Sequence, residues 1–100
     1  MRIQKTSEFD AWLGYESPKV RTMAKARLDV ISLGHFGSHR RFYGLIELKW
    51  LNGIRVYLFR QDIDLVVALY GGNKNAQDRD IKKAKKIRDQ VLNGTRTLHQ

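Results

Sequence analysis

The chain contains no cysteine, which excludes a disulfide framework, a zinc site built on thiolates and a cysteine nucleophile. It also lacks an apolar run long enough to span a membrane. The N-terminal stretch MRIQKTSEFD has no hydrophobic centre of the kind that signal peptides carry. The 3 histidines show no metal-ligand spacing, so we expect neither a metal site nor a cofactor. A cytoplasmic protein is the simplest expectation.

Acidic residues are scarce: 10 Asp and Glu stand against 19 Lys and Arg, which gives a formal net charge of +9. So basic a small domain usually binds a polyanion, and nucleic acid is the default partner. The alternative is a solvated surface that serves solubility alone. With 100 residues, 42% of them apolar, the chain has the length and the core of one domain.

Two helices are predicted near the N-terminus, after a short alternating strand, RIQKT. Ser7 is placed to cap the first helix, and Ser17 to cap the second, with Pro18 at its favoured first position. Gly34 is a natural C-terminal stop for the second helix. The two helices therefore form a hairpin with one buried side, and the apolar face of the first consists of Phe9, Trp12 and Leu13.

Three strands are predicted next, at residues 42–51, 54–60 and 63–70, preceded by a basic loop, HFGSHRRFYG. Asn75 is placed to cap a final helix rich in lysine. The order β-α-α-β-β-β-α predicts an α+β domain: a mainly antiparallel four-stranded sheet with a helical hairpin on one face, and a C-terminal helix. One domain is expected to cover residues 1–92, with a flexible tail at 93–100.

The stretch ELKWLNGIRVYLF predicts a β-hairpin, because Asn52-Gly53 separates two alternating apolar runs. A two-residue loop would pair Trp50 with Arg55 and mix apolar and charged side chains on both faces. A three-residue loop, Leu51-Asn52-Gly53, pairs Trp50 with Ile54 and makes one face wholly apolar. Since the buried pattern sets the register, we expect the three-residue loop, with Gly53 at positive φ.

This register places Lys49 directly opposite Arg55, an unfavourable pair of like charges, with both side chains pointing away from the core. Glu47, Tyr57 and Phe59 share their face. The cluster is either an ordinary group of surface charges, partly offset by Glu47, or a site that binds an anion such as phosphate. The register alone leaves both interpretations open.

The next turn is predicted at Gln61-Asp62, which would pair Leu58 with Leu65 and keep the other face of the sheet apolar. That face is expected to form the core with the helical hairpin. The residues predicted to be largely buried are Phe9, Trp12, Leu13, Met23, Leu28, Ile46, Leu48, Trp50, Val56 and Val67.

Four stretches carry a family resemblance: FDAWL, ELKW, GIRVYLF and GGNKNAQDRDIKKA. They are similar to the patterns F-x-x-W-L, E-L-R, G-Y-R-V-Y-F and G-G-D-K-x-x-Q-x-x-D-I-x-x-A of HigB-like addiction-module killer proteins in the RelE/ParE toxin superfamily. The fourth motif is the most specific. Departures are Lys49 for the usual arginine and Asn73 for the usual aspartate, and the loop GSHRRFYG is unusually basic.

The resemblance implies a RelE-like fold and the toxin of a type II toxin–antitoxin pair. Such toxins are typically mRNA endoribonucleases that act on the ribosome and are silenced by a protein antitoxin, here expected to be a helix-turn-helix protein. Cleavage would be metal-independent, by attack of the 2′-hydroxyl on the adjacent phosphate. The alternatives are a ParE-like inhibitor of DNA gyrase without enzymatic activity and an inactive nucleic-acid-binding module.

Four side chains are candidates for catalysis. Lys49 and Arg55 are candidates to balance the negative charge of the phosphate. Glu47 is a candidate general base, although the neighbouring cations would weaken its basicity. Tyr57 is a candidate to position the ribose or to donate a proton. Gly71-Gly72 forms either a phosphate-binding turn before a helix or a tight turn that needs glycine dihedrals. The further candidate RNA contacts are His39, Arg40, Arg41, Tyr70 and Lys74.

Overall fold

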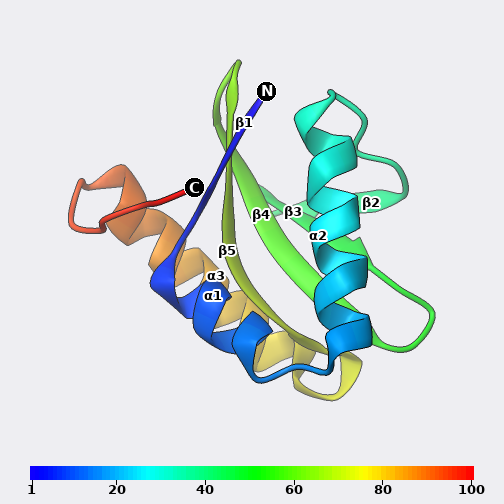
Figure 1. Cartoon of the computed structure of the whole chain (residues 1–100). Helices are drawn as coiled ribbons and strands as arrows, with labels where there is room; N and C mark the ends of the chain where they lie inside the picture. Colours follow the sequence, from blue (N-terminus) through cyan, green and yellow to red (C-terminus); the bar gives the residue numbers. More distant parts are fainter.

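Five strands form one mixed sheet with the order β1-β5-β4-β3-β2, and helices cover both of its faces (Figure 1). The structure, a computed structural model, describes all residues from 1 to 100. The elements are β1 (Arg2–Lys5), α1 (Ser7–Gly14), α2 (Pro18–Ser32), β2 (His39–Phe42), β3 (Leu45–Lys49), β4 (Ile54–Asp62), β5 (Leu65–Asn73), the short 3₁₀ helix η1 (Lys74–Ala76) and α3 (Gln77–Leu92). The predicted α+β class is confirmed.

The predicted four-stranded sheet is wrong in its strand count, because part of the expected basic loop forms β2. This strand pairs antiparallel with β3, with His39 opposite Leu48 and Phe42 opposite Leu45. It is an edge strand without a buried residue, so it lacks the apolar alternation that identifies a strand in a sequence. At the other edge β1 runs parallel to β5, which makes the sheet mixed.

The first hairpin has the predicted register. Lys49 lies opposite Arg55, Leu48 opposite Val56, and Gly53 has a φ of 94°. The Trp50 amide donates to the carbonyl oxygen of Ile54 at 3.1 Å, which closes the three-residue loop.

The predicted register of the second hairpin is wrong. The turn comes two residues later, with Asp62 opposite Leu65, and β4 and β5 are correspondingly longer. A bulge interrupts the pairing, because Tyr57 lies opposite Tyr70 while Leu58 lies opposite Ala68. This stretch of β5 is apolar on both faces, so its pattern does not distinguish one register from another.

Thr6 joins the bulge to the start of α1. Its hydroxyl donates to the Leu69 carbonyl at 2.7 Å and accepts the Phe9 amide at 3.0 Å. Thr6 is therefore the N-cap that was expected at Ser7. The predicted cap of the final helix at Asn75 is wrong: the N-cap of α3 is Ala76, which makes no side-chain bond, and Asn73 caps the preceding η1 by accepting the Asn75 amide at 2.9 Å. The predicted cap at Ser17 is confirmed.

The sheet separates two apolar clusters. The first joins α1 and α2 to one face through residues such as Phe9, Leu28 and Leu48. The second lies under α3 on the opposite face and includes Phe59 and Ile87. Most residues predicted for the core are buried; the exceptions, half-buried, are Trp12, Met23 and Trp50. No helix in the protein is both long enough and apolar enough to cross a membrane.

Residues near the C-terminus lie against β1 and α1. The main chain of His99 exchanges two hydrogen bonds with that of Lys5, of 2.7 and 3.1 Å. Arg96 forms an ion pair with Glu8, and the His99 Nε2 atom lies 2.8 Å from a carboxylate oxygen of Asp10. The flexibility of the tail at 93–100 stays a prediction.

Candidate nucleic-acid interface

The candidate catalytic residues occupy two neighbouring rows of the sheet, on the face that α3 partly covers. In one row Lys49 pairs with Arg55, which pairs with Gly72. In the next row, the order across the sheet is Arg40, Glu47, Tyr57 and Tyr70. Because alternate residues of a strand share a face, the side chains of both rows point to the same side.

Four cations surround this part of the sheet, and we call Arg40, Lys49, Arg55 and Lys74 the cation rim. Lys74 belongs to it because its amide donates to the Gly53 carbonyl at 2.9 Å, which holds η1 against the tip of the first hairpin. Arg40 lies 3.8 Å from Glu47, whereas the other three cations take part in no ion pair. The rim therefore carries positive charge that the protein itself leaves largely uncompensated.

Glu47 is fully buried, at 0% exposure, beneath the start of α3. Its Oε2 atom accepts a hydrogen bond of 2.7 Å from Gln77, while its Oε1 atom has no hydrogen-bond partner. A general base must come within hydrogen-bond reach of the proton that it removes. In this arrangement the carboxylate meets protein groups only, so the α3 cover separates Glu47 from any molecule bound at the rim.

Tyr57 is also fully buried, and its hydroxyl has no hydrogen-bond partner. Burial raises the pKa of Tyr57, and the nearby charges of Glu47 and Asp80 raise it further, so the phenol stays protonated. The buried Nε atom of Arg55 is likewise unpaired, although the guanidinium donates to the Ile54 carbonyl at 3.2 Å. Glu47, Arg55 and Tyr57 hold all the unpartnered buried side-chain polar atoms of the protein.

Gly71 and Gly72 serve neither of the two roles considered for them. Both lie within β5 and neither has a positive φ, so no tight turn requires them. A Cβ atom on Gly71 would lie 2.3 Å from the Trp12 indole, and one on Gly72 would lie 1.9 Å from the Asp80 carboxylate. The glycines leave room for α1 on one face of β5 and for α3 on the other, and no phosphate-binding turn forms there.

Asp80 is 2% exposed and packs against Gly72. Burial raises the pKa of Asp80, and Arg79, whose Nε atom lies 3.7 Å from the carboxylate, opposes that shift. The folded protein therefore binds a proton at this carboxyl more readily than the unfolded chain does. The stability that protonated Asp80 contributes is present below the unfolded pKa and is lost as the pH rises through the folded pKa.

Asp80→Asn is consequently expected to raise the melting temperature at neutral pH, because the amide keeps the shape without the cost of a buried charge. The gain should shrink as the pH falls into the acid range, where wild-type Asp80 is protonated. Thermal melting across this range measures it. Asp78→Asn is the control, since Asp78 is exposed in the same turn. Equal gains for both variants would contradict the assignment.

The remaining candidates are divided between the two faces. Tyr70 is half-buried beside α3, with the Lys83 ammonium 4.4 Å from its ring centroid. His39 and Arg41 alternate with Arg40 along β2 and so lie on the opposite face, away from the rim. Sequence reasoning missed Gln77 as a partner of Glu47. Gln77 and Asp80 are three residues apart, which places both side chains on one face of the helix. This spacing in the sequence could have indicated that Gln77 faces the sheet.

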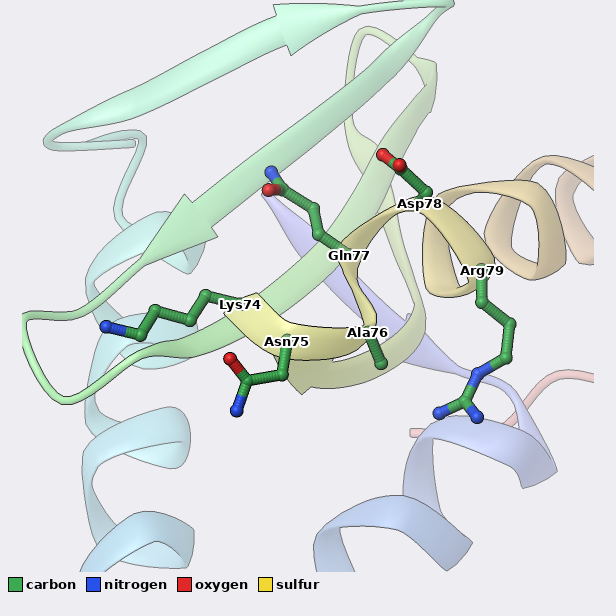
Figure 2. Close-up of a pocket in the computed structure, with 6 residues that line it drawn as sticks. All are labelled: Lys74, Asn75, Ala76, Gln77, Asp78 and Arg79. Carbon is green, nitrogen blue, oxygen red and sulfur yellow. The ribbon is translucent and has the colours of Figure 1, made fainter.

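A polar hollow of about 420 Å³ follows η1 and the first turn of α3 (Figure 2). Gln77 points from it toward the sheet, whereas Arg79 points the other way. Lys74 extends from the same turn toward the first hairpin, where its methylene groups lie beside Gly53. No group of three or more His, Asp or Glu side chains is arranged to hold a metal ion. Of the cation rim, Lys74 borders this hollow.

Comparison with known proteins finds a relative of similar length. No protein-family model matches the chain, and no solved structure matches it significantly. A Haemophilus influenzae protein, described as an uncharacterized protein, is 35% identical over 95 residues, which cover 91% of this chain and 96% of that protein. The chain therefore belongs to the same family as this Haemophilus influenzae protein.

Proposed function

We propose that the protein is the toxin of a type II toxin–antitoxin pair, a ribosome-dependent mRNA endoribonuclease that inhibits translation. The observation that carries the proposal is the cross-strand pair of Lys49 and Arg55, with Lys74 nearby and no ion pair to any of the three. Like charges at opposed positions cost stability unless an anion lies between them. A phosphate of RNA supplies that anion, and the resemblance described above supports the class of reaction.

The reaction proposed is attack of the ribose 2′-hydroxyl on the adjacent phosphorus, with departure of the 5′-oxygen. Negative charge accumulates on the phosphate oxygens in the transition state, where fixed cations stabilise it most. Arg55 offers two parallel N–H donors to two oxygens, and Lys49 adds a point charge from the neighbouring strand. The 2′-hydroxyl must lose a proton and the departing 5′-oxygen must gain one. In the proposed reaction Glu47 accepts the first proton and the Tyr57 phenol supplies the second, and contact of both groups with RNA requires the Gln77–Glu47 hydrogen bond to open.

The test incubates the purified protein with ribosomes and a message, and then maps the new RNA ends. Cleavage within the message, with a 2′,3′-cyclic phosphate at the upstream end, is the expected result. An intact message with translation still inhibited would favour a second candidate, a nucleic-acid-binding module without cleavage. The complete burial of Glu47 and Tyr57 is the observation that favours this alternative, since it leaves no acid–base group of the set exposed.

The antitoxin is expected to bind through an acidic or amphipathic segment that covers the cation rim. Its affinity should fall as salt rises, because screening shortens the Debye length from about 10 Å at 0.1 M to about 3 Å at 1 M. Calorimetric titration with the product of the neighbouring reading frame, at several salt concentrations, measures this. An affinity independent of salt would point to an apolar interface elsewhere.

A further inference from the structure

Cations and aromatic rings from α2, the loop before β2, β2 itself and the position just after β3 gather on the side of the sheet opposite the cation rim. We call Arg27, Phe36, His39, Arg41 and Trp50 the stacking platform. The Arg27 guanidinium lies 5.6 Å from the Trp50 ring centroid, and that of Arg41 lies 5.7 Å from the Phe36 centroid. The Phe36 and His39 rings are 5.6 Å apart, centroid to centroid. Phe36 and Trp50 pack against the first apolar cluster and, like Arg27 and His39, stay partly accessible to solvent, while Arg41 is exposed.

Hydrogen bonds hold the two guanidinium groups in place. Arg27 donates to the carbonyl of Phe36 at 3.1 Å and also to that of Ser38. Gly37 permits this, because its φ is +65° and a Cβ atom there would lie 3.2 Å from Arg27 Nη2. The Nδ1 atom of His39 donates to the Gly37 carbonyl at 2.8 Å, which leaves Nε2 to accept from Arg41 at 3.1 Å. The planes are therefore oriented before any ligand binds.

Neither Arg27 nor Arg41 takes part in an ion pair, although the chain carries 10 acidic residues. Aromatic rings and guanidinium planes are the two surfaces on which proteins stack unpaired bases. We propose that the platform binds single-stranded RNA by stacking two or three of its bases. This inference rests on the proposed function, and it assigns His39 and Arg41, two of the candidate RNA contacts, to the bases.

The placement of β2 connects the platform with the rim. This strand is the free edge of the sheet, and it carries Arg40 on the rim face and His39 and Arg41 on the platform face. A single strand of RNA that crosses this edge meets phosphate-binding cations on one side and stacking surfaces on the other. The two surfaces thus divide recognition into a salt-dependent part and a part that depends on the bases.

Binding of single-stranded oligodeoxynucleotides tests the platform. These probes lack the 2′-hydroxyl and cannot be cleaved by the proposed reaction, yet stacking tolerates the change of sugar. Fluorescence anisotropy compares an oligomer with an abasic oligomer of equal length and the same 3′ label. Phe36→Leu should weaken binding of the intact oligomer roughly tenfold or more, with an unchanged slope of affinity against salt. Binding of the abasic oligomer should not change.

Two further variants guard the interpretation. His39→Ala removes a ring from the exposed edge strand and should weaken binding several-fold. It replaces Phe36→Leu as the test if thermal melting shows that Phe36→Leu is unstable. Tyr15→Leu removes a ring that is 94% exposed at the end of α1, and it should have no effect. Wild-type affinity in both platform variants, or equal losses for intact and abasic oligomers, overturns the platform.

The outcomes remain separate from those of the cleavage assay. Base-dependent binding without cleavage of a message sustains the platform and rejects the endoribonuclease. Cleavage of a message, combined with platform variants that leave base-dependent binding unchanged, sustains the endoribonuclease and rejects the platform. In a third outcome, an acidic peptide competes for the surface as well as the intact oligomer does, while the intact oligomer binds no better than the abasic one. That result would assign this surface to a protein partner and reject the proposal.

Discussion

Gly71→Ala is expected to lower the free energy of unfolding by about 3 kcal/mol, although it adds a single methyl group. The new Cβ atom would lie 2.3 to 2.4 Å from three atoms of the Trp12 indole. Trp12 is itself packed against Phe9, at a centroid separation of 5.8 Å, so the ring has little room to retreat. Since Gly71 has no positive φ, the effect is steric and owes nothing to backbone strain.

Denaturant unfolding of four proteins tests this packing: the wild type, Gly71→Ala, Trp12→Ala and the double variant. Trp12→Ala alone should cost on the order of 3–5 kcal/mol. In the double variant the added methyl group occupies space left by the indole, so the loss should be well below the sum. Gly14→Ala is the control, because nothing lies within 4 Å of its new Cβ atom. Additive losses would contradict a clash between Gly71 and Trp12.

The first hairpin could be predicted because one face of β3 and β4 is wholly apolar, whereas the other carries the charges. A slip by one residue would mix apolar and charged side chains on both faces, and of the two loop lengths compared only the three-residue loop avoids that. The caps at Ser17 and Pro18 were equally local, since their effect depends on the next helical turn alone. These features were predictable because each depends on neighbours in sequence.

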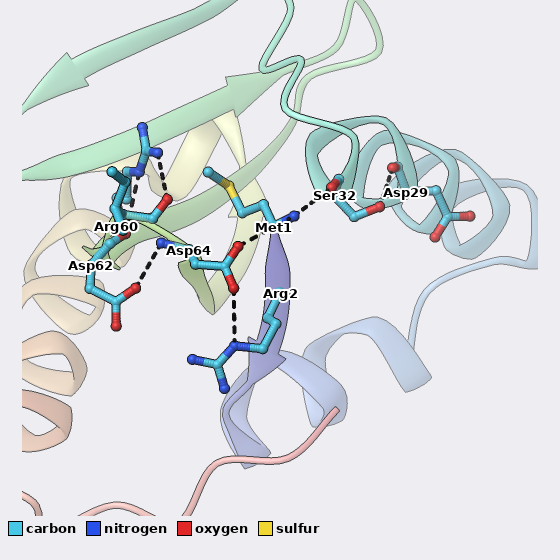
Figure 3. Close-up of polar contacts among 8 residues, drawn as sticks. Met1, Arg2, Asp29, Ser32, Arg60, Asp62 and Asp64 are labelled. Carbon is cyan, nitrogen blue, oxygen red and sulfur yellow. Dashed lines mark hydrogen bonds and ion pairs between the residues drawn. The ribbon is translucent and has the colours of Figure 1, made fainter.

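The second hairpin depends on contacts that no alternation encodes (Figure 3). The Asp62 carboxylate accepts the Asp64 amide at 2.8 Å, and Arg60 donates to the Ile63 carbonyl at 2.7 Å. These bonds favour the later turn. The bulge at Leu69 also requires Thr6, which is distant in sequence. Local polar bonds and one distant hydroxyl thus decided a register that the apolar pattern left undetermined.

The sequence predicted the strand register of the candidate site, but it did not predict which of the site residues are exposed. Lys49 and Arg55 lie opposite each other as expected, whereas Glu47 and Tyr57 are buried. Few apolar residues line the buried side of α3, so the sequence gave little indication that this helix packs over Glu47 and Tyr57. The start of the helix is held by a polar contact, the Gln77–Glu47 hydrogen bond. A sequence pattern shows which residues share a face, and it does not show which element covers that face.

Arg55→Ala is expected to reduce RNA cleavage roughly 10²–10³-fold, as loss of a group that stabilises transition-state charge does. Stability should hold or rise slightly. The substitution removes a guanidinium whose buried Nε atom has no partner, and it relieves repulsion with Lys49. Retained stability with lost activity is the signature of a residue kept for function at some stability cost. Lys49→Ala should have a smaller effect, since an ammonium lacks the bidentate geometry of arginine.

Arg60→Ala is the matched control, because it removes one positive charge from the same strand at the exposed turn (Figure 3). It should cleave at close to the wild-type rate, so a loss common to both arginine variants would reflect net charge. Thermal melting and ribosome-dependent cleavage under single-turnover conditions measure the two properties separately. If Arg55→Ala cleaves at the wild-type rate, the proposal that Lys49 and Arg55 hold the scissile phosphate is wrong. The uncompensated rim would then serve binding alone, which the burial of Glu47 and Tyr57 already favours as the second candidate.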